Sequence, residues 1–381
     1  MQTLAELLRT KRVIVTVGAG GVGKTTTAAA LAVAAAREGK RVLCLTIDPA
    51  RRLAESLGIG EMRTEAMDVD PARFAAAGIP FKGRLTAMML DTKGTFDDLV
   101  RRYSSSPQKA EALLSNKLYQ YVSTSLAGTQ EYMAMEKLAA VKGDKNYDLV
   151  VLDTPPTANA LDFLDAPERL VGALDSAAMR WFVEAFQSGS KFSLNFLAKG
   201  AAAVLRGIGK ITGGGFLESL SEFIAQLNDL FGGFRERAAR VKDALRGNDV
   251  SFLLVTSPSP ESLSEILFFA DKLKEASMPR AGFVINRVHD VPADAAAAGP
   301  TDVAAAMAAV GLDPRALPRV EQAFRDAKHQ AETDRANIAK FMAPYAKVLP
   351  VVLVAERDTD VHNVALLSAL GDTLLAGGDV R

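Results

Sequence analysis

The chain has 381 residues, enough for one large α/β domain or for one domain with a sizeable insertion. Lysine plus arginine and aspartate plus glutamate each number 45, so no overall basic field draws the chain onto nucleic acid or anionic lipid. The only cysteine, Cys44, excludes a disulfide within the chain, and the distant histidines His289, His329 and His362 have no metal-ligand spacing.

The sequence lacks the patterns of export signals and of membrane spans. Residues 1–12 form a short amphipathic segment without the apolar core and the small-residue cleavage site of a signal peptide. No uncharged apolar run approaches the roughly 18 residues that span a bilayer. Together with the single cysteine, which fits a reducing compartment, these features predict a cytoplasmic protein without stable membrane insertion.

Residues 12–30 predict a short strand, a glycine-rich turn and an alanine-rich helix. From Gly18 the order is glycine, four residues, Gly23, Lys24 and Thr25, which is the P-loop pattern. Glycines let the backbone fold around phosphate oxygens, while Lys24 reaches the β- and γ-phosphates and the Thr25 hydroxyl ligates Mg²⁺. The predicted nucleotide site comprises Gly20, Gly21, Val22, Gly23, Lys24, Thr25 and Thr26, with Lys24 also catalytic.

Two later strands end in an aspartate. Residues 41–47 predict a buried strand followed by Asp48, and residues 147–153 predict one that ends at Asp153. Ligands of parallel sheets sit beyond the carboxyl ends of strands, so both carboxylates should lie near the phosphates and serve in catalysis. For Asp48 an ordinary Asp-Pro turn is the alternative interpretation. Asp153 is predicted to hold Mg²⁺ together with Thr25, through a water molecule.

The remaining segments alternate between strands and helices, which predicts a doubly wound, mostly parallel α/β sheet of the P-loop NTPase class. Residues 60–82 are expected to be irregular, and residues 94–142 to form helices packed on the sheet, with a break at 104–107. Further strands are expected at 84–90, 251–256, 280–286 and 348–354, and further helices at 260–277, 302–343 and 361–375.

Residues 165–246 are too many for a single crossover helix and predict a helical insertion subdomain. The ATPase core would then consist of residues 1–164 and 247–381. From Leu217 to Phe234 apolar residues recur in steps of three and four. This stripe favours a helical layer folded on itself, and the alternative is an open apolar groove that accepts a helix from another protein.

Four segments resemble the successive motifs of the arsenical-pump ATPase and tail-anchored-protein targeting ATPase family: residues 18–26 (GAGGVGKTT), 46–53 (TIDPARRL), 153–164 (DTPPTANALDFL) and 283–287 (FVINR). This family belongs to the dimeric P-loop ATPases with a deviant Walker A motif. The resemblance implies that Asp48 orients the attacking water, that Asn286 contacts adenine, and that residues around Pro350 close the adenine pocket. It also implies a dimer with a second copy or a paralogue, and a helical subdomain that binds a hydrophobic segment.

The chain departs from the family pattern at positions that bear on function. Ala19 stands where family members carry a lysine that reaches the phosphates of the partner subunit, and Ala158-Asn159 replaces a Gly-His pair. We therefore expect a dimeric, Mg²⁺-dependent ATPase of this type with slow hydrolysis. A near-inactive nucleotide-binding regulatory subunit is the alternative. Arsenite efflux is a weaker alternative, because a metalloid site needs several thiolates and the chain has only Cys44.

Overall fold

The computed structural model describes residues 2–47, 52–60, 63–116, 119–120, 123, 129–154, 223, 236–291, 300–311 and 313–380. The chain divides into two compact units. The first comprises Met1–Met89, Asp144–Ala160 and Arg246–Arg381, and the second comprises Leu90–Gly143 and Leu161–Leu245. The predicted P-loop therefore belongs to the first unit.

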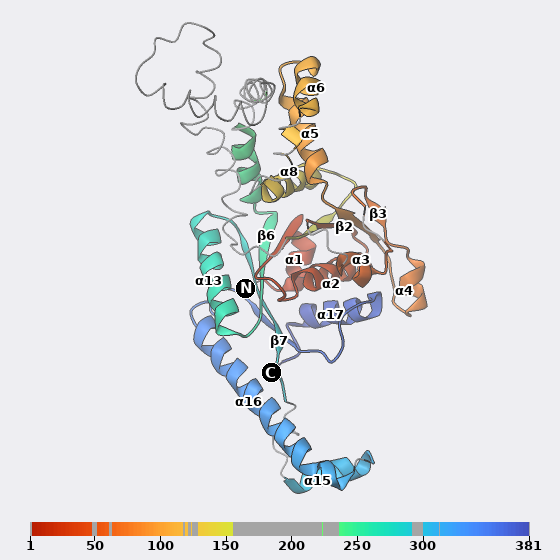
Figure 1. The fold of residues 1–381 in the computed structure, drawn as a ribbon, viewed down its shortest axis with the longest axis vertical. Coiled ribbons are helices and arrows are strands. Elements are labelled where there is room, and N and C mark those ends of the chain that lie inside the picture. The colour runs from red at the N-terminus through yellow and green to blue at the C-terminus, as the bar shows by residue number, and fades with distance from the viewer. Residues whose placement is uncertain are drawn as a thin grey trace, which may run out of the picture. The chain divides into compact units, whose positions relative to one another are not determined.

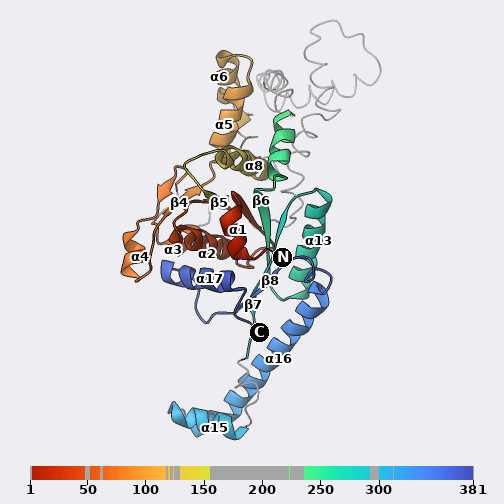
Figure 2. The same cartoon turned by 180° about the vertical axis from the view of Figure 1, so that it is seen from behind.

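The first unit is built around one eight-stranded sheet, seen from two sides in Figures 1 and 2. Its strands are β1 (Val13–Val17), β2 (Arg41–Thr46), β3 (Met67–Asp68), β4 (Arg84–Met89), β5 (Leu149–Asp153), β6 (Val250–Thr256), β7 (Arg280–Val288) and β8 (Val351–Ala355). They lie in the order β3-β4-β2-β5-β1-β6-β7-β8, and every neighbouring pair is parallel except β3 with β4. Strands β2 to β5 lie on one side of β1 and β6 to β8 on the other, which confirms the predicted doubly wound sheet.

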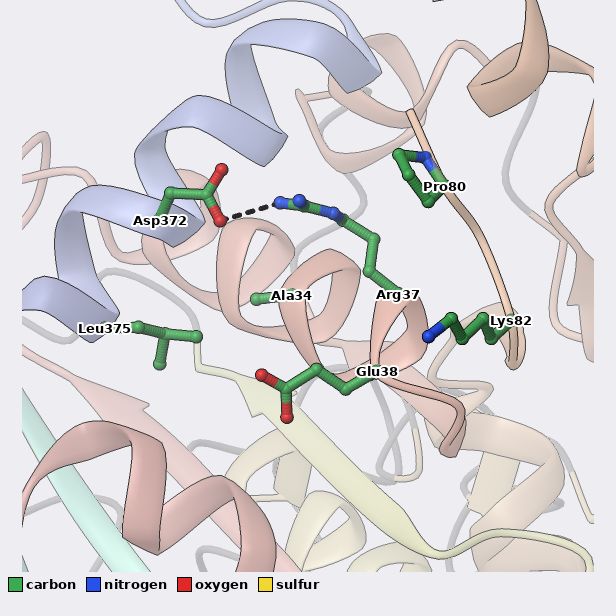
Figure 3. A pocket seen from close by; sticks show the side chains of 7 residues that line it. All are labelled: Ala34, Arg37, Glu38, Pro80, Lys82, Asp372 and Leu375. Atoms are coloured by element: carbon green, nitrogen blue, oxygen red, sulfur yellow. Dashed lines mark hydrogen bonds and ion pairs between the residues drawn. The ribbon is translucent and has the colours of Figure 1, made fainter. Parts of the chain in front are cut away.

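Helices cover both faces of this sheet (Figure 1). The helices α1 (Leu4–Thr10), α2 (Lys24–Arg37), α3 (Arg52–Leu57) and α17 (Val364–Ala376) pack together on one face, and α13 (Pro260–Glu275) and α16 (Leu317–Met342) lie on the other. Helix α2 buries a run of alanines, whose small side chains let α17 approach closely. A Cβ on Gly371 of α17 would lie only 2.9 Å from the carbonyl oxygen of Ala30. An ion pair of 2.8 Å between Arg37 and Asp372 joins the same two helices (Figure 3).

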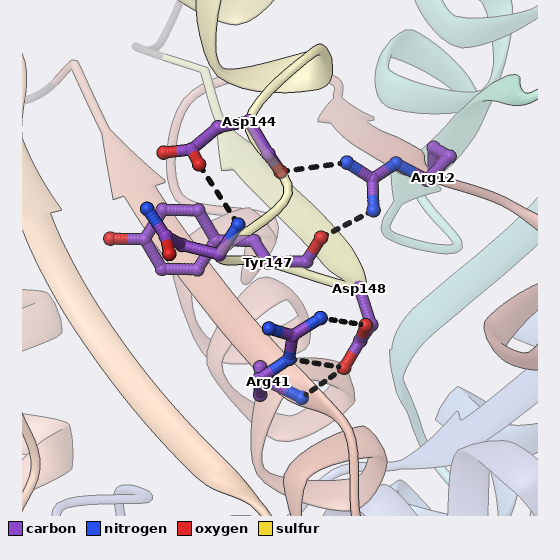
Figure 4. Close-up of polar contacts among 6 residues, drawn as sticks. Arg12, Arg41, Asp144, Tyr147 and Asp148 are labelled. Carbon is purple, nitrogen blue, oxygen red and sulfur yellow. Dashed lines mark hydrogen bonds and ion pairs between the residues drawn. The ribbon is translucent and has the colours of Figure 1, made fainter.

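Charged side chains tie together the amino ends of the central strands (Figure 4). Arg12, just before β1, donates hydrogen bonds to the carbonyl oxygens of Asp144, at 2.9 Å, and Tyr147. Arg41, at the start of β2, donates to both carboxylate oxygens of Asp148, at 2.7 and 3.1 Å. These contacts fix where β5 begins relative to β1 and β2.

Two segments of the first unit differ from the sequence prediction. The stretch 60–82, expected to be irregular, contains β3 and helix α4 (Ala72–Ala76). Strand β3 forms because Asp68 pairs with Arg84 of β4 at 2.8 Å, a contact that the local pattern does not contain. The single helix expected at 302–343 is divided into α15 (Pro300–Ala309), the 3₁₀ turn η1 (Pro314–Ala316) and α16. Gly311, with a φ of +73°, ends the first helix.

The second unit is helical where the structure describes it. It contains α5 (Thr92–Tyr103), α6 (Pro107–Ser115), α8 (Thr129–Lys142) and the helical residues 236–245. The break predicted at 104–107 is present, and Ser106 caps α6 through the backbone N–H of Lys109. These helices were expected on the sheet as part of the core, yet residues 90–143 group with residues 161–245. The apolar stripe from Leu217 to Phe234 lies outside the described residues, apart from Phe223.

Candidate functional site

The P-loop connects β1 to α2 at the carboxyl edge of the sheet, and its shape requires glycine. Gly21 and Gly23 have φ angles of +78° and +95°, a region that disfavours residues with a Cβ atom. At Gly18 a Cβ atom would lie 1.9 Å from the carbonyl oxygen of Val255 on β6. The predicted glycines therefore set both the curvature of the loop and its close approach to the neighbouring strand.

Asn286, near the end of β7, supports the loop from the side. Its amide nitrogen donates a hydrogen bond of 3.0 Å to the carbonyl oxygen of Val22. The same nitrogen would lie 2.3 Å from a Cβ atom on Gly23. Asn286 thus lies against the P-loop, although 264 positions separate it from Val22 in the sequence.

Lys24 begins α2 and is almost fully buried, with 6% of its surface exposed. Its ammonium group donates a hydrogen bond of 2.6 Å to the carbonyl oxygen of Ala19. The side chain therefore folds back along the loop whose backbone would surround the phosphates. In this position its charge belongs to the same site as the N-terminal end of α2, which also favours an anion.

Thr25 and Asp153 are brought together from different parts of the chain. The Thr25 hydroxyl donates to the Asp153 carboxylate at 2.8 Å, and the Thr46 hydroxyl at the end of β2 donates to the same oxygen at 3.1 Å. Asp153 pairs with both Thr16 and Thr46 in the parallel register, so these residues meet at the carboxyl edge. Thr154 donates a further bond of 2.8 Å to the carbonyl oxygen of Thr16.

A cavity of about 470 Å³ opens beside these residues. Its lining from the P-loop and α2 is Gly21, Gly23, Lys24, Thr25 and Thr26. Other elements contribute Glu55, Ser56, Thr154, Arg287, Asp360, Val361 and His362. The Ser56 hydroxyl donates to the carbonyl oxygen of Val361 at 3.2 Å, which ties the loop after β8 to α3. The cavity is large enough for the polyphosphate part of a nucleotide and polar enough to hold it.

Two predicted site residues are not part of this cluster. Asp48 lies outside the described residues. Pro350 precedes β8, and its carbonyl oxygen accepts the N–H of Phe283, so it lies near the amino ends of β7 and β8. Asn286 lies at the carboxyl end of β7, on the opposite edge. The structure therefore does not bring Pro350 together with Asn286 and the P-loop.

Comparison with known proteins identifies the family. A model of the anion-transporting ATPases matches residues 11–329. The chain belongs to the anion-transporting ATPase family. It is 28% identical over 284 residues to the ATPase get3 of Aspergillus terreus, with 74% of each chain covered. It is 26% identical over 284 residues to the ATPase GET3 of Phaeosphaeria nodorum, with 74% of this chain and 77% of the relative covered. The family resemblance seen in the motifs is confirmed.

The structure also places at the site residues that the sequence prediction missed. Arg287 lines the cavity from β7, and Asp360 and His362 line it from the loop after β8. A signal for the loop was present, because the last predicted strand is followed by the polar stretch ERDTDVHN. This stretch leaves β8 at the same edge as the P-loop, as the parallel register requires.

Cys44 lies on β2 with none of its surface exposed. Burial raises the pKa of its thiol, and the nearby Asp153 carboxylate raises it further. Among the described residues no group of three or more histidine, cysteine, aspartate or glutamate side chains is placed to hold a metal ion. Within the same described residues, no helix is both long and apolar enough to cross a membrane.

Proposed function

We propose that this chain is a Mg²⁺-dependent ATPase that hydrolyses ATP at the P-loop site. The observation that carries the proposal is the meeting of Lys24, Thr25 and Asp153 at one edge of the sheet, with Thr25 and Asp153 joined at 2.8 Å. A P-loop lysine, a hydroxyl and a strand-end carboxylate are the groups with which P-loop enzymes bind a triphosphate and its metal. Membership of an ATPase family supports the same conclusion.

The donor set fits Mg²⁺. This ion prefers hard oxygen ligands and retains several waters, and the site offers the Thr25 hydroxyl with the Asp153 carboxylate next to it. Thr25 would hold the metal directly and Asp153 through a water molecule. When bound, the ion would neutralise charge on the β- and γ-phosphates.

The residues of the chain would then position the nucleotide and the attacking water, and would supply positive charge to the phosphates. The P-loop N–H groups and Lys24 would stabilise the negative charge that develops on the phosphates during in-line attack by water. Asp48 is proposed to orient that water, on the resemblance alone. Asn286 is proposed to contact adenine while its amide bond to Val22 holds the loop.

The test is phosphate release from Mg-ATP by the purified full-length chain. Lys24→Ala and Asp153→Asn should each lower turnover by at least about 100-fold, because each removes a group that faces developing charge or the metal. Lys274→Ala, which changes an exposed lysine at the end of α13, serves as the matched control and should leave turnover unchanged. Equal turnover by all variants would refute the proposed site.

We also propose that ATP binding supports a dimer, with a second copy or a paralogue, and that nucleotide state moves the helical subdomain to bind a hydrophobic protein segment. The family resemblance supports this part. Light scattering with and without Mg-ATP would test the dimer. Co-purification of an apolar helix that depends on nucleotide state would test the client, and a helix that binds equally well without nucleotide would contradict the coupling.

A regulatory subunit with little turnover is the second candidate, and Ala19 is the observation that favours it. The short side chain of Ala19 packs partly buried against the core and supplies no cation. Ala19→Lys should raise turnover sharply if the missing charge limits the rate. Arsenite efflux has less support, because the buried Cys44 cannot join a thiolate cluster within the chain.

A further inference from the structure

Strand β7 contains an irregularity at the point where it reaches the P-loop. Its register with β8 shifts between Ile285 and Val288, as in a β-bulge. Successive side chains of a regular strand point to opposite faces, so Asn286 and Arg287 would normally diverge. Instead both line one cavity of about 130 Å³, together with Gly23 and Thr26. Bulges re-aim side chains in this way next to active sites.

The backbone of Arg287 adopts an unfavourable conformation in this arrangement. Its φ is +60°, in the left-handed region, which is unfavourable for a residue with a Cβ atom. Among the described residues, Ser277 is the other non-glycine residue with a positive φ. Ser277 follows the end of α13, a position where such a conformation is common. At Arg287 the conformation instead directs a long cationic side chain into a cavity.

Arg287 lies where two cavities meet. It lines both the larger cavity, with Lys24 and Thr25, and the smaller one, which neither Lys24 nor Thr25 lines. Gly23 and Thr26 line both cavities as well. In a P-loop the lysine faces the β- and γ-phosphates and the backbone surrounds the α- and β-phosphates. The shared part of the two cavities therefore corresponds to the end of the polyphosphate nearest the ribose.

The charges around Arg287 fit an anion at this position. Its side chain is exposed, and its guanidinium makes no hydrogen bond or ion pair within the described part of the chain. Asp360 lines both cavities and Glu356 lines the smaller one, so their carboxylates would repel a phosphate there. Arg357 also lines the smaller cavity, but not the larger one, and its guanidinium lies 3.6 Å from Asp379 and donates to the Thr373 hydroxyl at 3.3 Å. A guanidinium at the junction offsets this repulsion and can bind phosphate oxygens bidentately.

From this geometry we propose that Arg287 binds the α-phosphate of the nucleotide. The inference rests on the proposed function and adds a residue to the same site. ADP and ATP share the α-phosphate, so the contact stabilises both complexes equally and acts on affinity and KM while kcat stays unchanged. A cation at the γ-phosphate would instead favour ATP over ADP and affect kcat.

The experiment measures Kd for Mg-ADP and Mg-ATP by isothermal titration. Arg287→Ala should weaken both nucleotides by about 10-fold or more, as expected for loss of a charge-assisted hydrogen bond, and Arg287→Lys should recover part of the loss. Arg287→Gly should weaken binding to the same extent without lowering the midpoint of urea unfolding, because glycine tolerates the left-handed backbone. Arg325→Ala removes an exposed arginine of α16 that lines neither cavity and should bind normally.

The outcomes separate this inference from the proposed function. Weakened ATP binding with unchanged ADP binding would place Arg287 at the γ-phosphate and overturn the inference. Unchanged affinity for both nucleotides in Arg287→Ala would also overturn it, while the proposed function would stand. A wild-type chain that binds neither nucleotide would overturn both.

Discussion

The charge state of Asp148, at the amino edge of the sheet, is set chiefly by its neighbour Arg41. Hydrogen bonds from the Arg41 side chain and backbone lower the pKa of the Asp148 carboxyl to about 2 (Figure 4). A carboxyl group in an unfolded chain has a pKa of about 4. Because the folded-state pKa is the lower one, the pair stabilises the fold above pH 4, and this contribution is lost as the pH falls toward 2.

Asp148→Asn should therefore lower the free energy of unfolding at pH 7 by up to about 1 kcal/mol. The effect is modest because Arg41 and Asp148 expose 47% and 39% of their side chains, so solvent screens the pair. Urea unfolding at pH 7, 5 and 3 would show a deficit that is constant down to pH 5 and smaller at pH 3. The exposed Asp358→Asn is the control. A deficit that does not change with pH would contradict this explanation.

Single residues were predictable where their role is local. The P-loop glycines and Lys24 act within one turn of chain, so their spacing alone predicted both the loop and the site. Whether Pro350 belongs to the site depends on which end of β8 it occupies. Whether Arg287 belongs to it depends on the register shift in β7. Neither property is encoded in a short pattern, which is why Pro350 was included in the site and Arg287 was not.

At the scale of elements, a buried ion pair joins two helical segments of the second unit. Arg237, in the helical residues 236–245, donates to both carboxylate oxygens of Glu136 on α8, at 2.7 and 2.9 Å. Only 3% of the Glu136 side chain and 21% of the Arg237 side chain are exposed. Loss of the arginine would leave a buried carboxylate without its cation, which is far more costly than loss of a surface pair.

Arg237→Ala is therefore expected to destabilise the second unit by about 3 kcal/mol. Arg240→Ala, an exposed arginine on the same helical stretch, should change stability by less than about 0.5 kcal/mol. Replacing both partners, with Glu136→Met and Arg237→Leu in one variant, should recover most of the stability that Arg237→Ala loses, since no buried charge remains. Urea unfolding followed by circular dichroism measures all three variants. A double variant as unstable as Arg237→Ala would show that packing, rather than the buried charge, causes the effect.

Helices and strands were predictable where the hydrophobic pattern and the length of the segment are enough to identify them. The central strands are short, continuous and apolar, and the structure places all of them close to their predicted ranges. Strand β3 escaped prediction because two residues carry no periodicity, and its formation depends on the ion pair between Asp68 and Arg84. The division of 302–343 depends on the left-handed Gly311, which a helical pattern tolerates in sequence.

At the scale of the whole molecule, nucleotide binding should stabilise the chain by mass action. At a Mg-ADP concentration of about 100 times Kd, the free energy of unfolding of the first unit should rise by about 2.7 kcal/mol. EDTA should remove much of this gain if Thr25 and Asp153 hold the metal. Lys24→Ala should remove it as well. Thermal unfolding scans with Mg-ADP, with EDTA and with the variant measure the shift, and an equal shift in Lys24→Ala would place the bound nucleotide elsewhere.

The class of the sheet, doubly wound and mostly parallel, followed from the alternation of strands and helices, because parallel strands need crossover connections of one handedness. The order of the strands within the sheet was not predicted. The composition of the two units did not follow. Residues 90–143 lie between two strands of the sheet in sequence, and this favoured the prediction that they pack on it. Their grouping with residues 161–245 depends on contacts between segments far apart in the chain, such as Glu136 with Arg237.

The single thiol of the chain is enclosed on β2 between β4 and β5, where labelling reagents have no access to it in the folded state. Cysteines placed at two exposed positions, such as Lys274 in the first unit and Arg240 in the second, would therefore react without competition from Cys44. A fluorescent dye at each of these positions would report the distance between the units as nucleotide is bound and released. The native sequence thus already provides a background for single-molecule measurements, with no core residue to replace.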